Sequence, residues 1–276
     1  MPSKNKLPLI EKQAAGFGIF DLDETLFMHW DSLNDDIYKC VIEVLAGMLK
    51  ASGKRVSEEA MDEATKASYA EHGLPTIGPA RRWGIDHTKF HQGYHRLTLD
   101  RHVKPQFNER AQAHLDFYRE MNDLLREARS LGLKFGILTH GDDYWAHEVP
   151  TLMGIRTHFN ICRGIDGYQG RMKCTDSSLY TDFLRDARYY GSFNMVFMAE
   201  DREKNLRVPA TLGMMPVLVG VTGKKPDIMP HGTATYGSVI KALRVVVRMR
   251  RDWNAQLDAE DALRVQLGKG TALRPR

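Results

Sequence analysis

The sequence predicts an α/β protein in which a doubly wound parallel sheet carries an inserted all-helical domain. Short apolar runs recur without the alternation of half-exposed strands, and helical patterns lie between the later runs. The whole of residues 21–133 separates the first run from the second, which is far more than one crossover helix needs. A chain of 276 residues can form a large core together with a smaller inserted domain.

The apolar runs are the predicted strands, because short continuous runs suit strands buried on both faces of a parallel sheet. Turn or polar residues follow each of them. The predicted strands are 17–20, 134–139, 158–164, 194–199 and 214–221.

Helices are predicted where apolar residues recur at every third or fourth position. In the core these segments are 115–132, ending at Gly132, 177–191, ending at Gly191, and the shorter 201–213. The long first connection contains three more, at 35–52, 57–73 and 85–97.

This order predicts the domain organisation. We expect residues 14–29 and 114–235 to form the α/β core, residues 30–113 a helical cap, and residues 236–276 a C-terminal extension of one or two helices. Ligands of doubly wound sheets bind at the carboxyl ends of the strands. An insertion that leaves from that end is therefore expected to cover the site as a lid.

The composition narrows the classes of partner. A net charge of +4 and a pI near 8.9 suit anionic ligands but do not require nucleic acid, which is not an expected partner. The three cysteines are far apart and odd in number, which argues against a disulfide framework and favours a cytoplasmic location. The start of the chain lacks the apolar run of a signal peptide, and no run approaches about 18 apolar residues, so no membrane association is expected.

Polar side chains that can do chemistry follow four of the strand-like runs. Because parallel strands deliver their carboxyl ends to one edge of the sheet, these side chains are expected to share one small volume. They are Asp21, Asp23 and Thr25, then Thr139, His140 and Gly141, then Lys173, and finally Glu200 and Asp201.

This set suits phosphoryl transfer. Clustered carboxylates repel each other unless a cation lies between them, and a set of oxygen donors favours Mg²⁺. A carboxylate can attack phosphorus to give an aspartyl-phosphate, and a second carboxyl group two residues on can exchange the proton. Lys173 would neutralise the developing charge, while the Thr139 hydroxyl and the following backbone N–H would bind phosphate oxygens.

The motifs resemble those of the haloacid dehalogenase superfamily of phosphohydrolases. "DLDET" (21–25) matches its DxDxT motif, "ILTHG" (137–141) is similar to its second motif, Lys173 stands where its third motif places a lysine, and "MAEDREKNL" (198–206) is similar to its acidic fourth motif. The resemblance covers residues 17 to about 222 and implies a Rossmann-like core with a helical cap. Within the superfamily, residues 73–95 faintly resemble the cap of pyrimidine 5′-nucleotidases.

The resemblance also implies roles. Asp21 would be the nucleophile and Asp23 the general acid and base. Mg²⁺ would be held by the Asp21 carboxylate, the Asp23 backbone carbonyl and Asp201, with Glu200 as a further ligand. Dehalogenases of the superfamily lack the second aspartate, so Asp23 favours phosphoryl chemistry.

Two departures from the family pattern leave alternatives open. Lys173 is followed by Cys174 where the family usually has proline, so Arg171 is a rival for the cationic role. His140 stands where small or amide residues are common, so we expect it to touch substrate.

His87, His91 and His95 are spaced to share one face of a helix. A zinc site is disfavoured there because no carboxylate or cysteine completes it, which leaves a substrate-facing surface or a plainly packed or solvated face.

The function expected from the sequence is Mg²⁺-dependent hydrolysis of a small phosphate monoester through an aspartyl-phosphate. A phosphomutase of the same superfamily and a non-enzymatic phospho-accepting signalling domain are the alternatives. The partner is expected to be a small phosphorylated metabolite, whose identity the sequence leaves open, as it does the oligomeric state.

Overall fold

A computed structural model describes residues 16–221 and 229–270 of the chain. Its centre is a six-stranded sheet in the order β3-β2-β1-β4-β5-β6, in which every neighbouring pair is parallel. The described residues leave out the start of the chain, residues 14–15 and 222–228 of the predicted core, and residues 271–276 of the predicted C-terminal extension.

The five predicted strands are present, three of them shorter than expected. The strands are β1 (Phe17–Phe20), β2 (Lys134–Thr139), β3 (Ile161–Gly164), β4 (Val196–Glu200), β5 (Met215–Leu218) and β6 (Ala234–Thr235). Residues 156–158 form a 3₁₀ turn, so β3 begins only at Ile161. The two-residue strand β6 has no pattern that periodicity could detect.

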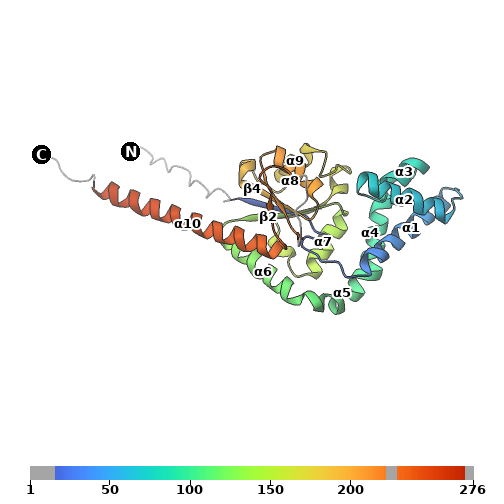
Figure 1. The fold of residues 1–276 in the computed structure, drawn as a ribbon, viewed down its shortest axis with the longest axis horizontal. Coiled ribbons are helices and arrows are strands. Elements are labelled where there is room, and N and C mark those ends of the chain that lie inside the picture. Colours follow the sequence, from blue (N-terminus) through green and yellow to red (C-terminus); the bar gives the residue numbers. More distant parts are fainter. Residues whose placement is uncertain (1–15, 222–228, 271–276) are drawn as a thin grey trace, which may run out of the picture.

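Alternate residues of the strands enter two apolar layers, one on each face of the sheet. Phe20, Phe135 and Phe197 pack with α6 (Leu115–Ser130), α7 (Asp143–Leu152) and α10 (Val239–Gly270). Ile19 and Met198 pack on the other face with α8 (Ser177–Asp186), beside α9 (Arg207–Thr211). Figure 1 shows α8 and α9 on one side of the sheet and α6 and α10 on the other. The predicted doubly wound α/β core is confirmed.

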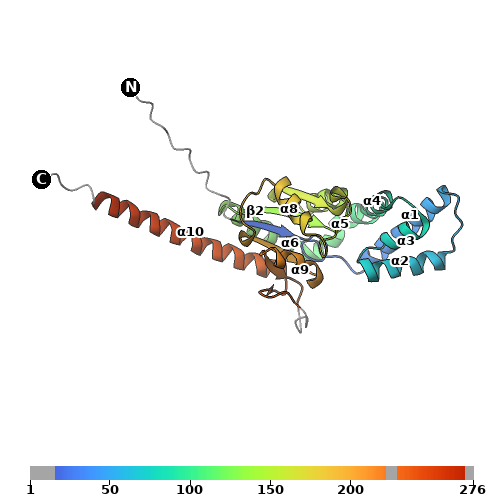
Figure 2. The ribbon, with the colours of Figure 1, turned by 90° about the horizontal axis from the view of Figure 1, so that it is seen from above.

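Most of the residues between β1 and α6 are helical. They form α1 (Leu33–Ala51), α2 (Glu58–His72), α3 (Ile77–Trp83), α4 (His87–Thr98), a π-helical turn (Leu99–Val103) and α5 (Lys104–Arg110). Side chains of α1, α2 and α4 share an apolar cluster of their own, which includes Leu45, Met61 and Phe90. Figures 1 and 2 show α1–α4 together at one end of the molecule, while α10 extends from the other end. Where the cap begins and ends stays a prediction.

Two helix predictions need correction. Helix α8 ends at Asp186 and not at Gly191, because Arg188 already takes the left-handed backbone conformation, with φ of 54°. The segment 201–213 is a 3₁₀ turn (Glu203–Leu206) followed by α9. Where one or two C-terminal helices were expected, the described residues form the single helix α10. Among the described residues, no helix has both the length and the apolar character that a membrane crossing requires.

Candidate active site

The sheet order brings the predicted site residues to one edge. Thr139 ends β2, Glu200 ends β4, and Asp21 follows β1, which lies between those two strands. The Asp21 backbone N–H donates to the Ala199 carbonyl at 2.9 Å, which fixes Asp21 beside the end of β4. The carboxyl ends of three neighbouring strands therefore place these side chains together.

Lys173 reaches this edge from the segment after β3. Its Nζ lies 2.6 Å from Asp21 Oδ1 and 2.7 Å from Glu200 Oε2, and the side chain is fully buried. The Tyr180 hydroxyl donates to the Lys173 carbonyl at 3.0 Å and holds this segment against α8. Burial alone would lower the pKa of Lys173, but Asp21 and Glu200 outweigh it and raise the pKa, so the ammonium stays charged.

Arg171 does not lie at this position. Its guanidinium donates to Ser178 Oγ at 2.6 Å and to Asp182 Oδ2 at 2.8 Å, and both partners belong to α8. Lys173, and not Arg171, is the cation in contact with Asp21.

The carboxylates of Asp21, Glu200 and Asp201 offer oxygen atoms that lie within 4.8 Å of one another. Burial raises the pKa of Asp21 to about 6, with Asp201 and Asp23 adding to the rise and Lys173 opposing it. Such a group of oxygen donors fits a hard divalent cation, which would relieve the repulsion.

The three carboxylates are not equally free to bind a metal. Both oxygens of Glu200 have partners, because Oε1 accepts from Asn205 Nδ2 at 2.7 Å and Oε2 from Lys173. Glu200 is thus placed to hold the lysine, while Asp21 and Asp201 are the better candidates for direct ligands. The assignment of Glu200 as a ligand stays a prediction.

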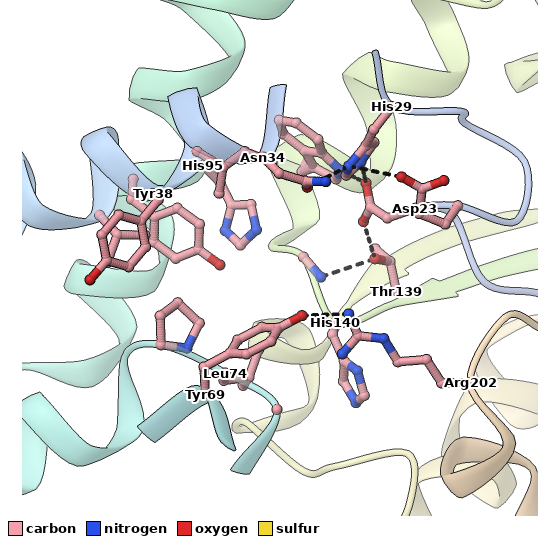
Figure 3. A pocket seen from close by; sticks show the side chains of 18 of the residues that line it. Asp23, His29, Asn34, Tyr38, Tyr69, Leu74, His95, Thr139, His140 and Arg202 are labelled. Carbon is pink, nitrogen blue, oxygen red and sulfur yellow. Dashed lines mark hydrogen bonds and ion pairs between the residues drawn. The ribbon is translucent and has the colours of Figure 1, made fainter. Parts of the chain in front are cut away.

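Asp23 points to a different set of partners (Figure 3). Its Oδ1 accepts from Trp145 Nε1 at 3.0 Å and lies 3.0 Å from His29 Nε2, and its Oδ2 accepts from the Thr139 hydroxyl at 3.3 Å. Burial works to raise the pKa of Asp23, but the hydrogen bond and charge of His29, helped by Trp145, bring the pKa below its usual value. The same contact raises the pKa of His29 against the effect of its burial, so the pair holds one proton readily.

The predicted phosphate-binding residues form a tight turn after β2. The Thr139 hydroxyl accepts from the Gly141 backbone N–H at 3.0 Å, and His140 Nε2 lies 3.4 Å from the Lys173 backbone N–H. Burial, and then the charge of Lys173, hold the pKa of His140 well below its usual value, so the ring is neutral and can accept this contact. A Cβ on Gly164 would lie 2.3 Å from the Asp142 carbonyl carbon, so only glycine at the end of β3 allows this turn.

A cavity of about 580 Å³ connects these groups. Its walls include every predicted site residue except Lys173, which lies behind Asp21 and Glu200, and Thr25, which is buried and does not line the cavity. The other lining residues include side chains of α1, α2 and α4, among them Tyr38, Tyr69, Tyr94 and His95. His91 and His95 are buried, and His95 lines the cavity, whereas the described residues form no metal-binding group around these histidines.

Sequence reasoning missed His29, Trp145, Asn205 and Arg202, which line the same cavity. A signal existed for Trp145, because Asp142 accepts from the Trp145 backbone N–H at 2.8 Å as the N-cap of α7. An aspartate followed by a helical pattern would have placed Trp145 in the first turn of a helix that starts at the active-site edge. For His29 and Arg202 the sequence carries no comparable signal.

Comparisons with known proteins bear on the fold. No protein-family model matches the chain, and no curated protein sequence matches it. A crystal structure described as a "predicted phosphatase" from Clostridium acetobutylicum is similar at 15% identity, with a TM-score of 0.50, over 86% of this chain and 100% of that one. This similarity establishes the fold and not the activity.

Two further solved structures are similar at lower scores. A haloacid dehalogenase-like family hydrolase from Streptococcus pneumoniae has 14% identity and a TM-score of 0.48, over 84% of this chain and 98% of that one. A 2-haloacid dehalogenase from Pseudomonas syringae pv. Tomato DC3000 has 17% identity and a TM-score of 0.46, over 85% and 99%.

Proposed function

We propose that the chain is a haloacid dehalogenase-like, Mg²⁺-dependent phosphatase that hydrolyses a small phosphate monoester through an aspartyl-phosphate, and the parallel sheet and the similarity in fold to a predicted phosphatase support this. The observation that supports this most strongly is the contact of Lys173 Nζ with Asp21 Oδ1 at 2.6 Å beside the carboxylates of Glu200 and Asp201. A buried lysine beside these carboxylates gives a nucleophile, a cation and a metal-binding group at one edge of the sheet.

In the first step an oxygen of Asp21 attacks phosphorus and the bond to the ester oxygen breaks. The leaving oxygen takes a proton from the Asp23–His29 pair, whose Oδ1–Nε2 separation of 3.0 Å lets the two groups share one. Lys173 remains beside Asp21 and offsets the charge that gathers on the phosphoryl group.

In the second step Asp23 takes a proton from water, and the hydroxide oxygen bonds to phosphorus as the phosphorus–Asp21 bond breaks. Inorganic phosphate leaves, and Asp21 returns to its carboxylate form. The contacts of Asp23 with Trp145 and Thr139 favour its carboxylate form, which this step requires.

The metal would be held by Asp21 and Asp201, whose oxygen atoms lie within the same 4.8 Å group, together with the Asp23 backbone carbonyl that the family pattern assigns. When bound, it would supply positive charge for the phosphate oxygens. The Thr139 hydroxyl and the turn at His140 and Gly141 would bind the remaining phosphate oxygens.

Two alternatives use the same aspartyl-phosphate. A phosphomutase returns the phosphoryl group to an acceptor, and a signalling domain keeps it. Hydrolytic dehalogenation is a third candidate, because solved structures with this kind of fold include dehalogenases. Asp23 argues against it, since a displaced halide needs no proton.

The experiment incubates the purified chain with Mg²⁺ and a panel of phosphate monoesters, without a bisphosphate activator, and measures inorganic phosphate. We expect phosphate release that Asp21→Asn abolishes, because a carboxamide is a poor nucleophile. Asp116→Asn, at a fully exposed carboxylate on α6, is the matched control. Halide release from a 2-haloacid without phosphate release, or a phosphoryl-enzyme that persists for minutes, would refute the proposal.

A further inference from the structure

The cavity is larger than the phosphate site requires. Its volume of about 580 Å³ lies within the range of roughly 300–1,000 Å³ that encloses a small organic ligand. The acidic end, with Asp21 and Thr139, is expected to take only the phosphoryl group. The remaining space lies among α1, α2 and α4 and is available to the alcohol part of the ester.

We call this part of the cavity the helical half and define it by the residues that line it from those helices and from the turn after α2. Aromatic and aliphatic side chains dominate it. They are Ile37, Tyr38, Val41, Tyr69, Ala70, Leu74, Pro75 and Tyr94. Figure 3 shows Tyr38 and His95 on one side of the open space and Tyr69 and Leu74 on the other.

Several polar atoms at the rim of the helical half are already occupied. The Tyr38 hydroxyl donates to Asp62 Oδ1 at 2.5 Å, and Lys66 Nζ lies 2.8 Å from Asp62 Oδ2. The Tyr69 hydroxyl accepts from Arg202 Nη2 at 2.5 Å. Two of the three tyrosines therefore present mainly their rings to the cavity, and the one lysine is paired.

Negative charge is also missing from these walls. In the described structure no aspartate or glutamate from α1, α2 or α4 lines the cavity, and Asn34 is turned to His29, with Oδ1 at 3.0 Å from Nδ1. The hydroxyl oxygens of Thr65 and Thr98, which also line the cavity, have no hydrogen-bond partner within the described residues, so a few polar atoms remain in these walls. Aromatic and aliphatic side chains still make up most of the helical half.

We propose that the alcohol part of the substrate carries an aromatic ring, which lies between Tyr38 and Tyr69 in the helical half. This inference rests on the proposed function, since it places the ester phosphate at Asp21. Rings packed on rings favour an aromatic group over a saturated one by about three- to tenfold. A simple aryl-alkyl phosphate and a nucleoside monophosphate both offer such a ring.

The test compares four esters in phosphate release with Mg²⁺. Benzyl phosphate and cyclohexylmethyl phosphate match in size and differ in aromaticity, glucose 6-phosphate supplies a sugar, and uridine 5′-monophosphate supplies a ring on a nucleoside. We expect kcat/KM for benzyl phosphate to exceed that for cyclohexylmethyl phosphate by about threefold or more, and also to exceed that for glucose 6-phosphate, which carries no aromatic ring. A higher value for the nucleotide than for benzyl phosphate would identify the nucleoside as the source of the ring.

Two variants at one position separate the ring from its hydroxyl. Tyr38→Leu is expected to bring the benzyl-to-cyclohexylmethyl ratio close to one, whereas Tyr38→Phe is expected to keep that ratio. The control Tyr190→Leu changes a tyrosine that is 83% exposed and lies outside the cavity. An unchanged ratio in Tyr38→Leu would overturn the placement of the ring.

Binding to Asp21→Asn, measured by calorimetry with the same four esters, does not depend on turnover. Equal or tighter binding of glucose 6-phosphate than of benzyl phosphate would overturn the inference about the ring. Tighter binding of benzyl phosphate by this variant, with no phosphate release by the unmodified chain, would instead overturn the proposed hydrolysis and leave the inference standing.

Discussion

The indole Nε1–H of Trp145 donates a hydrogen bond of 3.0 Å to Oδ1 of Asp23, although 122 residues separate the two in sequence. Trp145 lies in the first turn of α7 and is almost fully buried. His29 contacts the same oxygen, and Thr139 donates to the other one. The carboxylate of Asp23 is therefore held from three sides, which fixes the direction in which it can exchange a proton.

Trp145→Phe removes this hydrogen bond and keeps an aromatic side chain. Because a hydrogen bond to a charged group contributes about 1.5–3 kcal/mol, we expect kcat to fall by roughly 10- to 100-fold. Vanadate, as a phosphate analogue, should bind with unchanged affinity, because Asp21 and Lys173 stay in place. Trp253→Phe, at a half-exposed position on α10, is the control, and an equal kcat in the two variants would contradict the role of Trp145.

Lys173→Met breaks a buried cluster of charges. Asp21 and Glu200 would stay buried without their cation, so we expect the free energy of unfolding to fall by about 3–5 kcal/mol and turnover to be lost. Urea denaturation measures the first effect and phosphate release the second. The double variant Lys173→Met, Glu200→Gln should regain part of the stability, because one unpaired charge is removed.

Lys241→Met, at an exposed position on α10, controls for the loss of a lysine. A Lys173→Met variant as stable as this control would show that the ion pairs of Lys173 do not stabilise the fold.

Removal of divalent cations by EDTA should stop phosphate release, and added Mg²⁺ should restore it. Asp201→Asn weakens one of the oxygen donors, so the Mg²⁺ concentration needed for half-maximal rate should rise by about tenfold or more. Calorimetric titration of Mg²⁺ into the unmodified chain and into Asp201→Asn checks this without turnover. Indifference of the rate to EDTA would remove the metal from the mechanism.

His91 predicts a pH dependence of stability. Its side chain is 1% exposed, and neither ring nitrogen has a hydrogen-bond partner within the described residues. Burial, and then the charges of His95 and His87, hold its pKa well below the usual value of 6.5. Below about pH 6.5 the unfolded chain takes up a proton that the folded chain does not, so stability falls as the pH is lowered.

The contribution of His91 is at most about 1.4 kcal/mol for each pH unit below that value. We expect the thermal midpoint to fall between pH 7 and pH 5.5 and to fall less in His91→Phe, which keeps an aromatic ring beside His87, Tyr94 and His95. His72→Phe, at a partly exposed position at the end of α2, is the control. An equal pH slope in His91→Phe and the unmodified chain would exclude this histidine as the cause.

The core of the candidate site could be predicted from the sequence because the carboxyl ends of parallel strands meet at one edge of the sheet. Asp21, Thr139 and Glu200 stand at the carboxyl ends of adjacent parallel strands, so the strand pattern alone brings them together. Lys173 lies on a loop, and only the order of motifs predicted its place. Trp145 and Arg202 reach the cavity through side-chain directions that periodicity does not report.

The fold class was predicted for a similar reason. Buried parallel strands such as β2 and β4 are continuous apolar runs, which stand out from their surroundings. Helix ends were harder, because the chain turns at Arg188, where an arginine takes a backbone conformation that usually marks glycine. Helix α3 and strand β6 are so short that a periodic pattern of apolar residues in them cannot be distinguished from chance.

The side chains around the cavity come from separate stretches of sequence. Residues 37–75 supply Tyr38, Tyr69 and most of the apolar wall, while Asp21, Thr139 and Asp201 lie outside that stretch. Substitutions within α1 and α2 can therefore change which molecules fit without touching a carboxylate. A change of substrate preference thus needs substitutions in one stretch of the chain only, while the carboxylates stay the same.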